Sequence, residues 1–148
     1  ELQNSGATSL VKTLQMIRLE KTIFLVGMFS VFEALLQERL KCDKGFNEAK
    51  EILKKAGEIE TLNQFIDFCQ VVNTLKHGRG KSYNALIKKE GRTINFKIKR
   101  ANQDYFDEGD ISEISTLVDI DDNFIYSCVE IINRVSDLIM KYRPDVIL

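Results

Sequence analysis

Helix breakers are almost absent from this chain, and their scarcity limits the folds that it can adopt. The 148 residues contain a single proline, Pro144, close to the C-terminal end. Proline interrupts a helix because it lacks a backbone N–H and its ring clashes with the preceding turn. Since 44% of the residues are hydrophobic, the chain is able to build one core of its own. We therefore expect a single all-α domain over residues 1–148.

The longest helical pattern runs from Thr8 to about Cys42. Apolar residues recur there at spacings of three and four, which places them on one side of a helix. They are Leu10, Leu14, Ile17, Phe24, Met28, Val31 and Leu35. The pattern predicts one continuous apolar stripe, the form that the buried face of a bundle helix takes.

Glycine marks the ends of two further helical segments. The stretch 46–57 ends at Gly57, and the stretch from about Glu60 to His77 is followed by Gly78. Glycine adopts the left-handed conformation that often closes a helix, so both stretches are predicted to be helices with glycine caps. Lys76 and His77 then occupy a last turn, where positive charge complements the helix dipole.

Polar side chains mark the starts of two later helices. Ser82 is placed to cap a short helix that ends near Gly91, and Asp121 or Asp122 is placed to cap a long final helix that reaches Tyr142. Oxygen atoms of Ser and Asp side chains accept hydrogen bonds from the N–H groups of a first helical turn. We therefore expect helices to begin at these residues.

Between these two helices the periodicity changes from that of a helix to that of a strand. In residues 93–99, Ile94, Phe96 and Ile98 alternate with polar residues. Alternation with a period of two is typical of a half-buried strand. Residues 113–120 are a suitable partner, so we expect a small antiparallel β-ribbon over one side of the bundle.

Several classes of protein are excluded by what the sequence lacks. Cys42, Cys69 and Cys128 are odd in number and form no Cys-x-x-Cys pair, so neither a disulfide framework nor a zinc site is predicted. The longest apolar run, Thr22 to Phe32, is about half of the ~20 residues that span a bilayer. We expect a cytoplasmic protein with no metal, no cofactor and no membrane association.

The charges are segregated along the chain although the net charge is only −1. Residues 76–100 contain nine Lys or Arg and one acid, Glu90, whereas residues 101–122 contain eight acids and no Lys or Arg. A basic segment of this kind can bind the phosphates of a nucleic acid. It can equally hold the two oppositely charged segments together, or form a solvated face.

The only histidine, His77, follows Asn73 by one helical turn. Residues four apart lie on the same face of a helix. Histidine exchanges protons near neutral pH, and an adjacent amide can orient it or hold a substrate oxygen. The alternative is structural, with His77 capping helix carbonyls and Asn73 bonded to a neighbouring helix, because an isolated Asn-x-x-x-His match has little specificity.

Three stretches of this sequence resemble the HEPN superfamily. They are "VFEALLQERL" at the end of the long helix, "NTLKHGRGKS" at the end of a later helix, and "LVDIDDNFI" before the last helix. The resemblance covers about residues 24–142. It implies a compact bundle with two long antiparallel helices plus shorter ones, of a kind found in bacterial toxin, antiphage and RNA-processing systems.

The resemblance also implies a role for each residue around His77. Asn73, the three intervening residues and His77 match the polar residue, spacing and histidine of the family signature. His77 is then the proton-transfer residue and Asn73 the orienting group. Cationic residues that could bind RNA phosphates are Lys76, Arg79 and Lys81.

One signature residue of the family is not matched. The family carries an arginine immediately before the polar residue, and Val72 occupies that position. An arginine fork stabilises phosphate charge in the transition state, and its loss could remove several kcal/mol. Family members that cut RNA do so as homodimers, without metal, through attack by the ribose 2′-hydroxyl.

Two functions follow from these observations. The first is an RNA-associated domain of a toxin or defence system that acts as a metal-independent endoribonuclease in a homodimer, with a cognate antitoxin as a further partner. The second is a non-catalytic dimerisation or protein-binding module of the same fold, in which Asn73 and His77 are structural.

Overall fold

The computed structural model describes residues 2–100 and 117–148, with side chains from residue 6 onward. Within them the chain forms five helices and two short strands. The helices are α1 (Leu2–Leu40), α2 (Gly45–Lys55), α3 (Ile59–His77), α4 (Lys81–Lys88) and α5 (Asp122–Tyr142), and the strands are β1 (Lys97–Ile98) and β2 (Val118–Asp119). The predicted all-α helical bundle is therefore confirmed.

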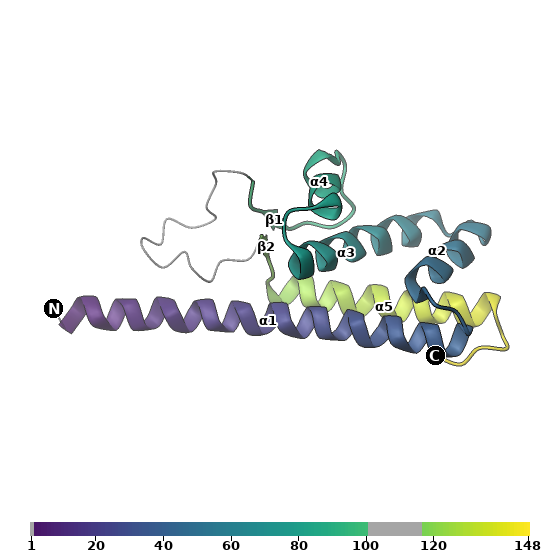
Figure 1. The fold of residues 1–148 in the computed structure, drawn as a ribbon, viewed down its shortest axis with the longest axis horizontal. Coiled ribbons are helices and arrows are strands. Elements are labelled where there is room, and N and C mark those ends of the chain that lie inside the picture. Colours follow the sequence, from purple (N-terminus) through teal and green to yellow (C-terminus); the bar gives the residue numbers. More distant parts are fainter. Residues whose placement is uncertain (1, 101–116) are drawn as a thin grey trace.

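Three long helices, rather than two, run along the axis of the bundle (Figure 1). α1 and α5 run in the same direction, and α3 lies against both of them in the opposite direction. α2 packs at the end of the bundle where α1 finishes, and α4 lies beside the C-terminal end of α3. The predicted antiparallel pairing of long helices thus holds for α1 with α3.

Phenylalanine rings hold the centre of the bundle together. Phe29 of α1 lies with its ring centre 5.6 Å from that of Phe46 in α2, and 6.4 Å and 6.3 Å from those of Phe65 and Phe68 in α3. Phe68 continues the contacts to Phe124 of α5 at 5.1 Å. One aromatic cluster therefore joins four helices, with aliphatic side chains of each helix packed around it.

The apolar stripe predicted for the first helix is not its core face. Leu10, Leu14, Ile17, Phe24 and Val31 are exposed, and Met28 and Leu35 are only partly buried. The core side of α1 consists of Leu25, Phe29, Phe32, Leu36 and Leu40. The prediction was wrong because α1 carries apolar residues at helical spacing on two sides, and spacing alone does not say which side the bundle covers.

The helix ends follow their predicted chemistry in three of four cases. Asp121 caps α5, with its carboxylate accepting the N–H of Phe124 at 2.7 Å. Gly57 and Gly78 close α2 and α3 with positive φ angles, although the ψ of −145° at Gly78 is not that of the expected left-handed helical conformation. The prediction for Ser82 was wrong. α4 begins at Lys81 after Gly80, so Ser82 lies inside its first turn.

The β-ribbon is present but shorter than predicted. Lys97 pairs with Asp119 and Ile98 with Val118, in antiparallel orientation. Residues 113–116 of the predicted partner lie outside the described residues. Upstream of β1 the side chains still alternate between exposed and half-buried, and Ile94 and Phe96 pack against the core. The period of two in the sequence therefore reflects alternating burial, while the hydrogen-bonded ribbon is short. Beyond the two paired residues of each strand, the N–H of Lys99 donates to the carbonyl of Leu117 at 2.8 Å.

A buried carboxylate fixes α4 and the segment after it to α3. Asp67 of α3 is completely buried and forms an ion pair with Lys89, directly after α4. The N–H and the hydroxyl of Thr93 both donate to the same carboxylate, at 3.2 Å and 2.8 Å. On the other side of α4, the hydroxyl of Tyr83 donates to the carbonyl of Lys99 at 2.8 Å. These contacts hold α4 and the segment after it against α3.

Candidate functional site

The last turn of α3 presents Asn73 and His77 to solvent. Both residues are exposed, while Val72 and Thr74 beside them are buried. Neither Asn73 nor His77 makes a side-chain hydrogen bond within the described part of the chain. The structural alternative, in which His77 caps carbonyls and Asn73 bonds a neighbouring helix, is therefore not seen there.

Gly78 allows the chain to turn back beside His77. Its φ of 71° and ψ of −145° define a conformation open essentially only to glycine, and its N–H donates to the carbonyl of Thr74 at 2.8 Å. Gly80 is extended, with open space where a Cβ would be, so its backbone does not require glycine. The turn brings Lys81 and the start of α4 close to the end of α3.

A hollow of about 240 Å³ lies at this turn. Its lining residues are Asn73, His77, Gly78, Gly80, Lys81 and Ser82. Among the described residues, no side chain caps the first turn of α4, so its N–H groups lack the side-chain acceptor that often satisfies a helix start. The hollow therefore combines a proton-exchanging imidazole, an amide, a lysine and the positive end of a helix dipole, a set that suits an anion.

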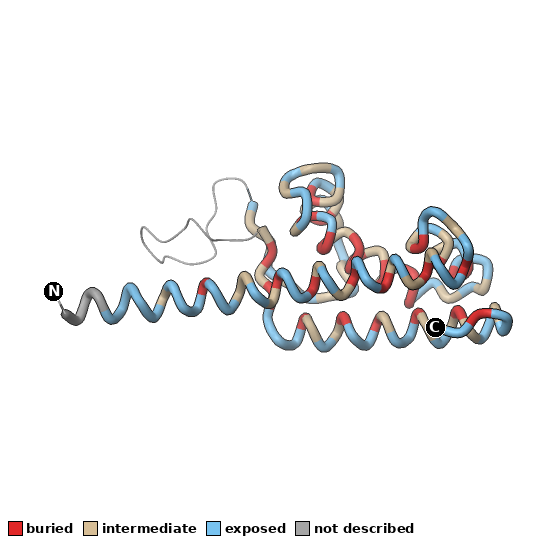
Figure 2. Tube along the Cα trace, turned by 60° about the horizontal axis from the view of Figure 1, so that its bottom comes forward, coloured by how far each residue is buried: buried red, intermediate tan, exposed pale blue. Residues whose placement is uncertain are grey.

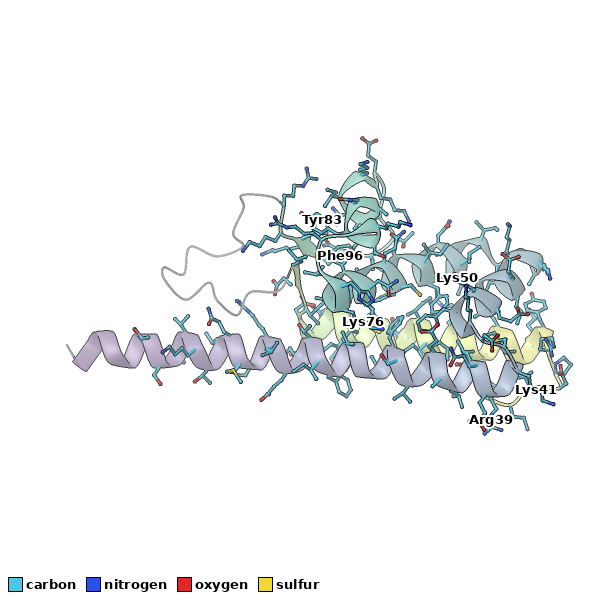
Figure 3. All side chains as sticks on the ribbon, in the orientation of Figure 1. Arg39, Lys41, Lys50, Lys76, Tyr83 and Phe96 are labelled. Carbon is cyan, nitrogen blue, oxygen red and sulfur yellow. The ribbon has the colours of Figure 1, made fainter. Side chains whose placement is uncertain are left out.

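The other two predicted phosphate-binding residues do not line the hollow. Lys76 and Arg79 are exposed, and neither forms an ion pair within the described residues. The guanidinium of Arg79 lies 6.0 Å from the ring centre of Tyr83. Figure 3 shows Lys76 at the end of α3 and Tyr83 on α4. Of the three predicted cations, the structure places only Lys81 with Asn73 and His77.

Val72 occupies a core position. Its side chain is 3% exposed and belongs to the hydrophobic cluster of the bundle. An arginine with the same side-chain direction would carry an unpaired charge into that cluster, which is strongly unfavourable. Valine at this position, where the HEPN signature has an arginine, is therefore consistent with how α3 packs.

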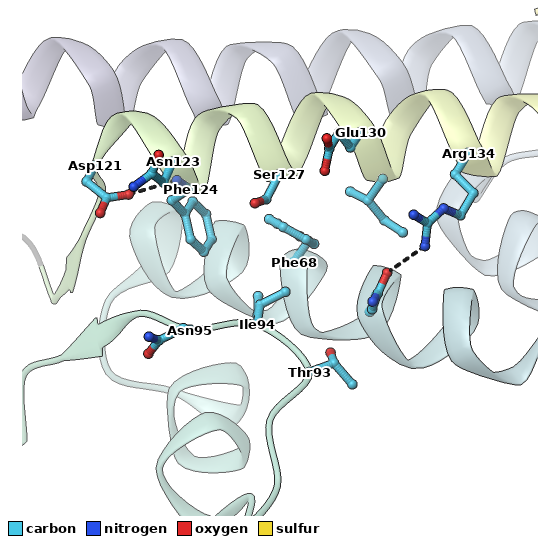
Figure 4. A pocket seen from close by; sticks show the side chains of 12 residues that line it. Phe68, Thr93, Ile94, Asn95, Asp121, Asn123, Phe124, Ser127, Glu130 and Arg134 are labelled. Atoms are coloured by element: carbon cyan, nitrogen blue, oxygen red, sulfur yellow. Dashed lines mark hydrogen bonds between the residues drawn. The ribbon is translucent and has the colours of Figure 1, made fainter.

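A second, larger hollow of about 350 Å³ lies between α3, α5 and the segment that precedes β1 (Figure 4). Phe68, Ile94, Phe124 and Ile131 are its apolar lining residues. Its polar lining residues are Gln64, Thr93, Asn95, Asp121, Asn123, Ser127, Glu130 and Arg134. Sequence reasoning missed this hollow because three separate segments form it. The sequence did contain one signal for this hollow. The polar residues at positions 123, 127, 130 and 134 have the spacing of residues on one face of a helix.

Part of this polar lining holds the bundle together. Arg134 of α5 donates to the amide oxygen of Gln64 in α3 at 3.2 Å, and Asp121 is occupied as the cap of α5. Figure 4 shows both interactions at opposite ends of the hollow. The hollow therefore includes a direct link between α3 and α5.

Two cysteine thiols are held in their neutral form by burial. Burial raises the pKa of Cys69 to about 12, with a nearby Lys50 opposing the shift. Burial also raises the pKa of Cys128 above its ordinary value. Thiolate is the reactive form of cysteine, so neither residue is a suitable nucleophile. Among the described residues, no group of three or more His, Cys, Asp or Glu is placed to hold a metal ion.

Thiol labelling tests the cysteine environments. At pH 8 we expect iodoacetamide to modify the half-buried Cys42 in the folded protein, and Cys69 and Cys128 at least about 100-fold more slowly, because a raised pKa lowers the thiolate fraction. In concentrated urea all three should react at similar rates. Mass spectrometry of tryptic peptides measures each site, and rapid native labelling of Cys69 would contradict the assignment.

No protein-family model, curated protein or solved structure matches this chain. Among the described helices, none is long and apolar enough to cross a membrane.

Proposed function

We propose that this chain is an RNA-associated domain of the HEPN kind, and that the hollow beside His77 binds an RNA phosphate. The supporting observation is that the exposed Asn73 and His77 share this hollow with Lys81. Phosphate binding by lysine is the sequence-independent part of nucleic-acid affinity. Lys76 and Arg79, exposed on the same turn, would extend contact to neighbouring phosphates.

The same groups can support a metal-independent cleavage. In this proposal His77 accepts the proton of a ribose 2′-hydroxyl, whose oxygen attacks the adjacent phosphorus. The bond from phosphorus to the 5′-oxygen breaks, the 5′-oxygen takes up a proton, and a 2′,3′-cyclic phosphate remains. Lys81 would balance the charge on the phosphate oxygens, a task for which Val72 is unsuited. A second copy of the chain would supply a second His77 as the proton donor.

The cellular setting is proposed from the sequence resemblance alone. Domains of this kind occur in toxin and antiphage systems. A cognate antitoxin is therefore the first protein partner to test. The non-catalytic alternative keeps the phosphate-binding hollow and loses only the cleavage step.

RNA binding and cleavage separate these functions. We expect Lys81→Ala to weaken binding of a fluorescent single-stranded RNA by about 5- to 10-fold and to reduce the slope of log K against log salt by about one, as loss of one phosphate contact should. Lys88→Ala removes the same charge from an exposed position at the other end of α4 and is the matched control. Equal effects of the two variants would contradict a specific role for the hollow.

Cleavage is measured on a mixed RNA pool in EDTA. Fragments with cyclic-phosphate ends that disappear with His77→Ala would support the endoribonuclease. RNA binding without such fragments would support the non-catalytic alternative.

A further inference from the structure

α1 carries an apolar stripe that the rest of the described molecule leaves uncovered. Five large apolar side chains on it are strongly exposed: Leu10 62%, Leu14 49%, Ile17 41%, Phe24 58% and Val31 70%. Met28 and Leu35 continue the same stripe and are partly buried. A continuous exposed apolar surface of this kind marks an interaction site in most soluble proteins.

The spacing of this stripe is that of a coiled-coil seam. Positions 10, 14, 17, 21, 24, 28, 31 and 35 alternate steps of four and three, and Lys21 is the only polar residue among them. Steps of four and three give a period of 3.5, which keeps one seam facing one partner helix. The same alternation of steps relates the side chains of α1 that face the bundle, at positions 22, 25, 29, 32 and 36. α1 therefore has two seams, and its own bundle fills one of them.

The first half of α1 projects beyond the bundle. Figures 1 and 2 show it extending away from the other helices, and between residues 6 and 21 only Gln15 is buried. Helical segments of this length are marginal in water without tertiary packing on an apolar face. Within the described residues, the open seam of this half has no apolar surface packed against it, so a further surface would bind there.

We propose that the open seam binds the same seam of a second copy of this chain, with the two α1 helices antiparallel. In the register centred between Thr22 and Ile23, every apolar residue of the seam except Phe24, which lies beside Lys21, meets an apolar residue of the other copy. The pairs are Leu10 with Leu35, Leu14 with Val31, and Ile17 with Met28. A two-fold axis generates this contact twice from one surface, as homodimers require.

Lys21 and the available area both favour the antiparallel arrangement. A parallel pair would place Lys21 against Lys21, whereas the antiparallel register places it near Phe24, with its ammonium held 2.9 Å from Asp122.

The seam from Leu10 to Leu35 is about 39 Å long and about 10 Å wide. Its area is therefore roughly half of the ~800 Å² that each partner buries in a stable interface. In the antiparallel pair, each projecting half also reaches the other copy's bundle, which supplies further area.

The proposed dimer surface lies on α1. Leu14 and Val31 are absent from the lining of the hollow beside His77, so variants at these two residues test the dimer without altering the proposed RNA-binding residues.

Sedimentation equilibrium at tens of micromolar tests the dimer. For the wild-type protein we expect a mass twice the 17.0 kDa of the chain. Leu14→Glu should raise the dissociation constant of the dimer about 100-fold or more, because it buries an unpaired charge in the seam. Ser30→Glu adds the same charge at an exposed position that lies away from the seam in the heptad and should leave the dimer intact. A wild-type monomer, or a Leu14→Glu dimer as tight as wild type, would overturn the proposal. Circular dichroism would check that each variant is folded.

Cysteine pairing tests the orientation. In a Cys42→Ser background, we expect oxidation to join Leu14→Cys protein to Val31→Cys protein in a mixture, with little self-linking of either variant. If each variant forms disulfide-linked dimers on its own, and the mixture forms no more linked product than the two variants do separately, the helices are parallel. That result would overturn the antiparallel arrangement.

Discussion

Lys89→Met is expected to lower the free energy of unfolding by about 3 kcal/mol. The substitution removes the cation that pairs with Asp67, a carboxylate with 0% of its side chain exposed. The two hydrogen bonds from Thr93 would remain, but the negative charge would stay buried without an opposite charge. Removing one partner of a buried ion pair is costly because the remaining charge cannot recover its hydration. Urea denaturation followed by circular dichroism measures the loss.

Two further variants identify the cause. Lys88→Met alters the neighbouring lysine, which is exposed and forms no ion pair within the described residues, and should change stability by less than about 0.5 kcal/mol. Adding Asp67→Asn to Lys89→Met removes the buried charge and should recover part of the lost stability. If the double variant is less stable than Lys89→Met alone, the buried charge is not the source of the loss.

The sequence predicted those parts of the fold that depend on local chemistry. Helix ends at Gly57, Gly78 and Asp121 were identified because each cap uses one residue with a specific backbone or side-chain property. The common face of Asn73 and His77 followed from helical spacing in the same way. The alternation at Ile94 and Phe96 correctly indicated half-burial, although it overestimated the hydrogen-bonded ribbon.

Features that depend on packing between distant segments were not predictable. On α1, the sets Leu25, Phe29, Phe32 and Phe24, Met28, Val31 have similar spacing and hydrophobicity, and only the position of the other helices decides which set is buried. The hollow that contains Gln64 and Arg134 joins residues 70 positions apart. Local periodicity contains no information about such contacts.

Phe29→Ala should have the other large effect on stability, a loss of about 3–5 kcal/mol. The ring is fully buried and touches rings from α2 and α3, so alanine would leave a cavity at the point where three helices meet. Helix backbones constrained by several neighbours cannot move in to fill such a space, and the lost contacts add to the lost transfer free energy.

Phe24→Ala is the matched control for this effect, because it removes the same ring from the same helix at an exposed position. Both substitutions are made in the Leu14→Glu background, so that association of two copies does not contribute to the measured stability. We expect Phe24→Ala to cost less than about 1 kcal/mol there. Similar losses for the two variants would mean that Phe29 is not in the core, and that α1 presents its Phe24 side to the bundle instead. Because the open seam exists only if Phe29 faces inward, this comparison also tests the geometric premise of the proposed dimer.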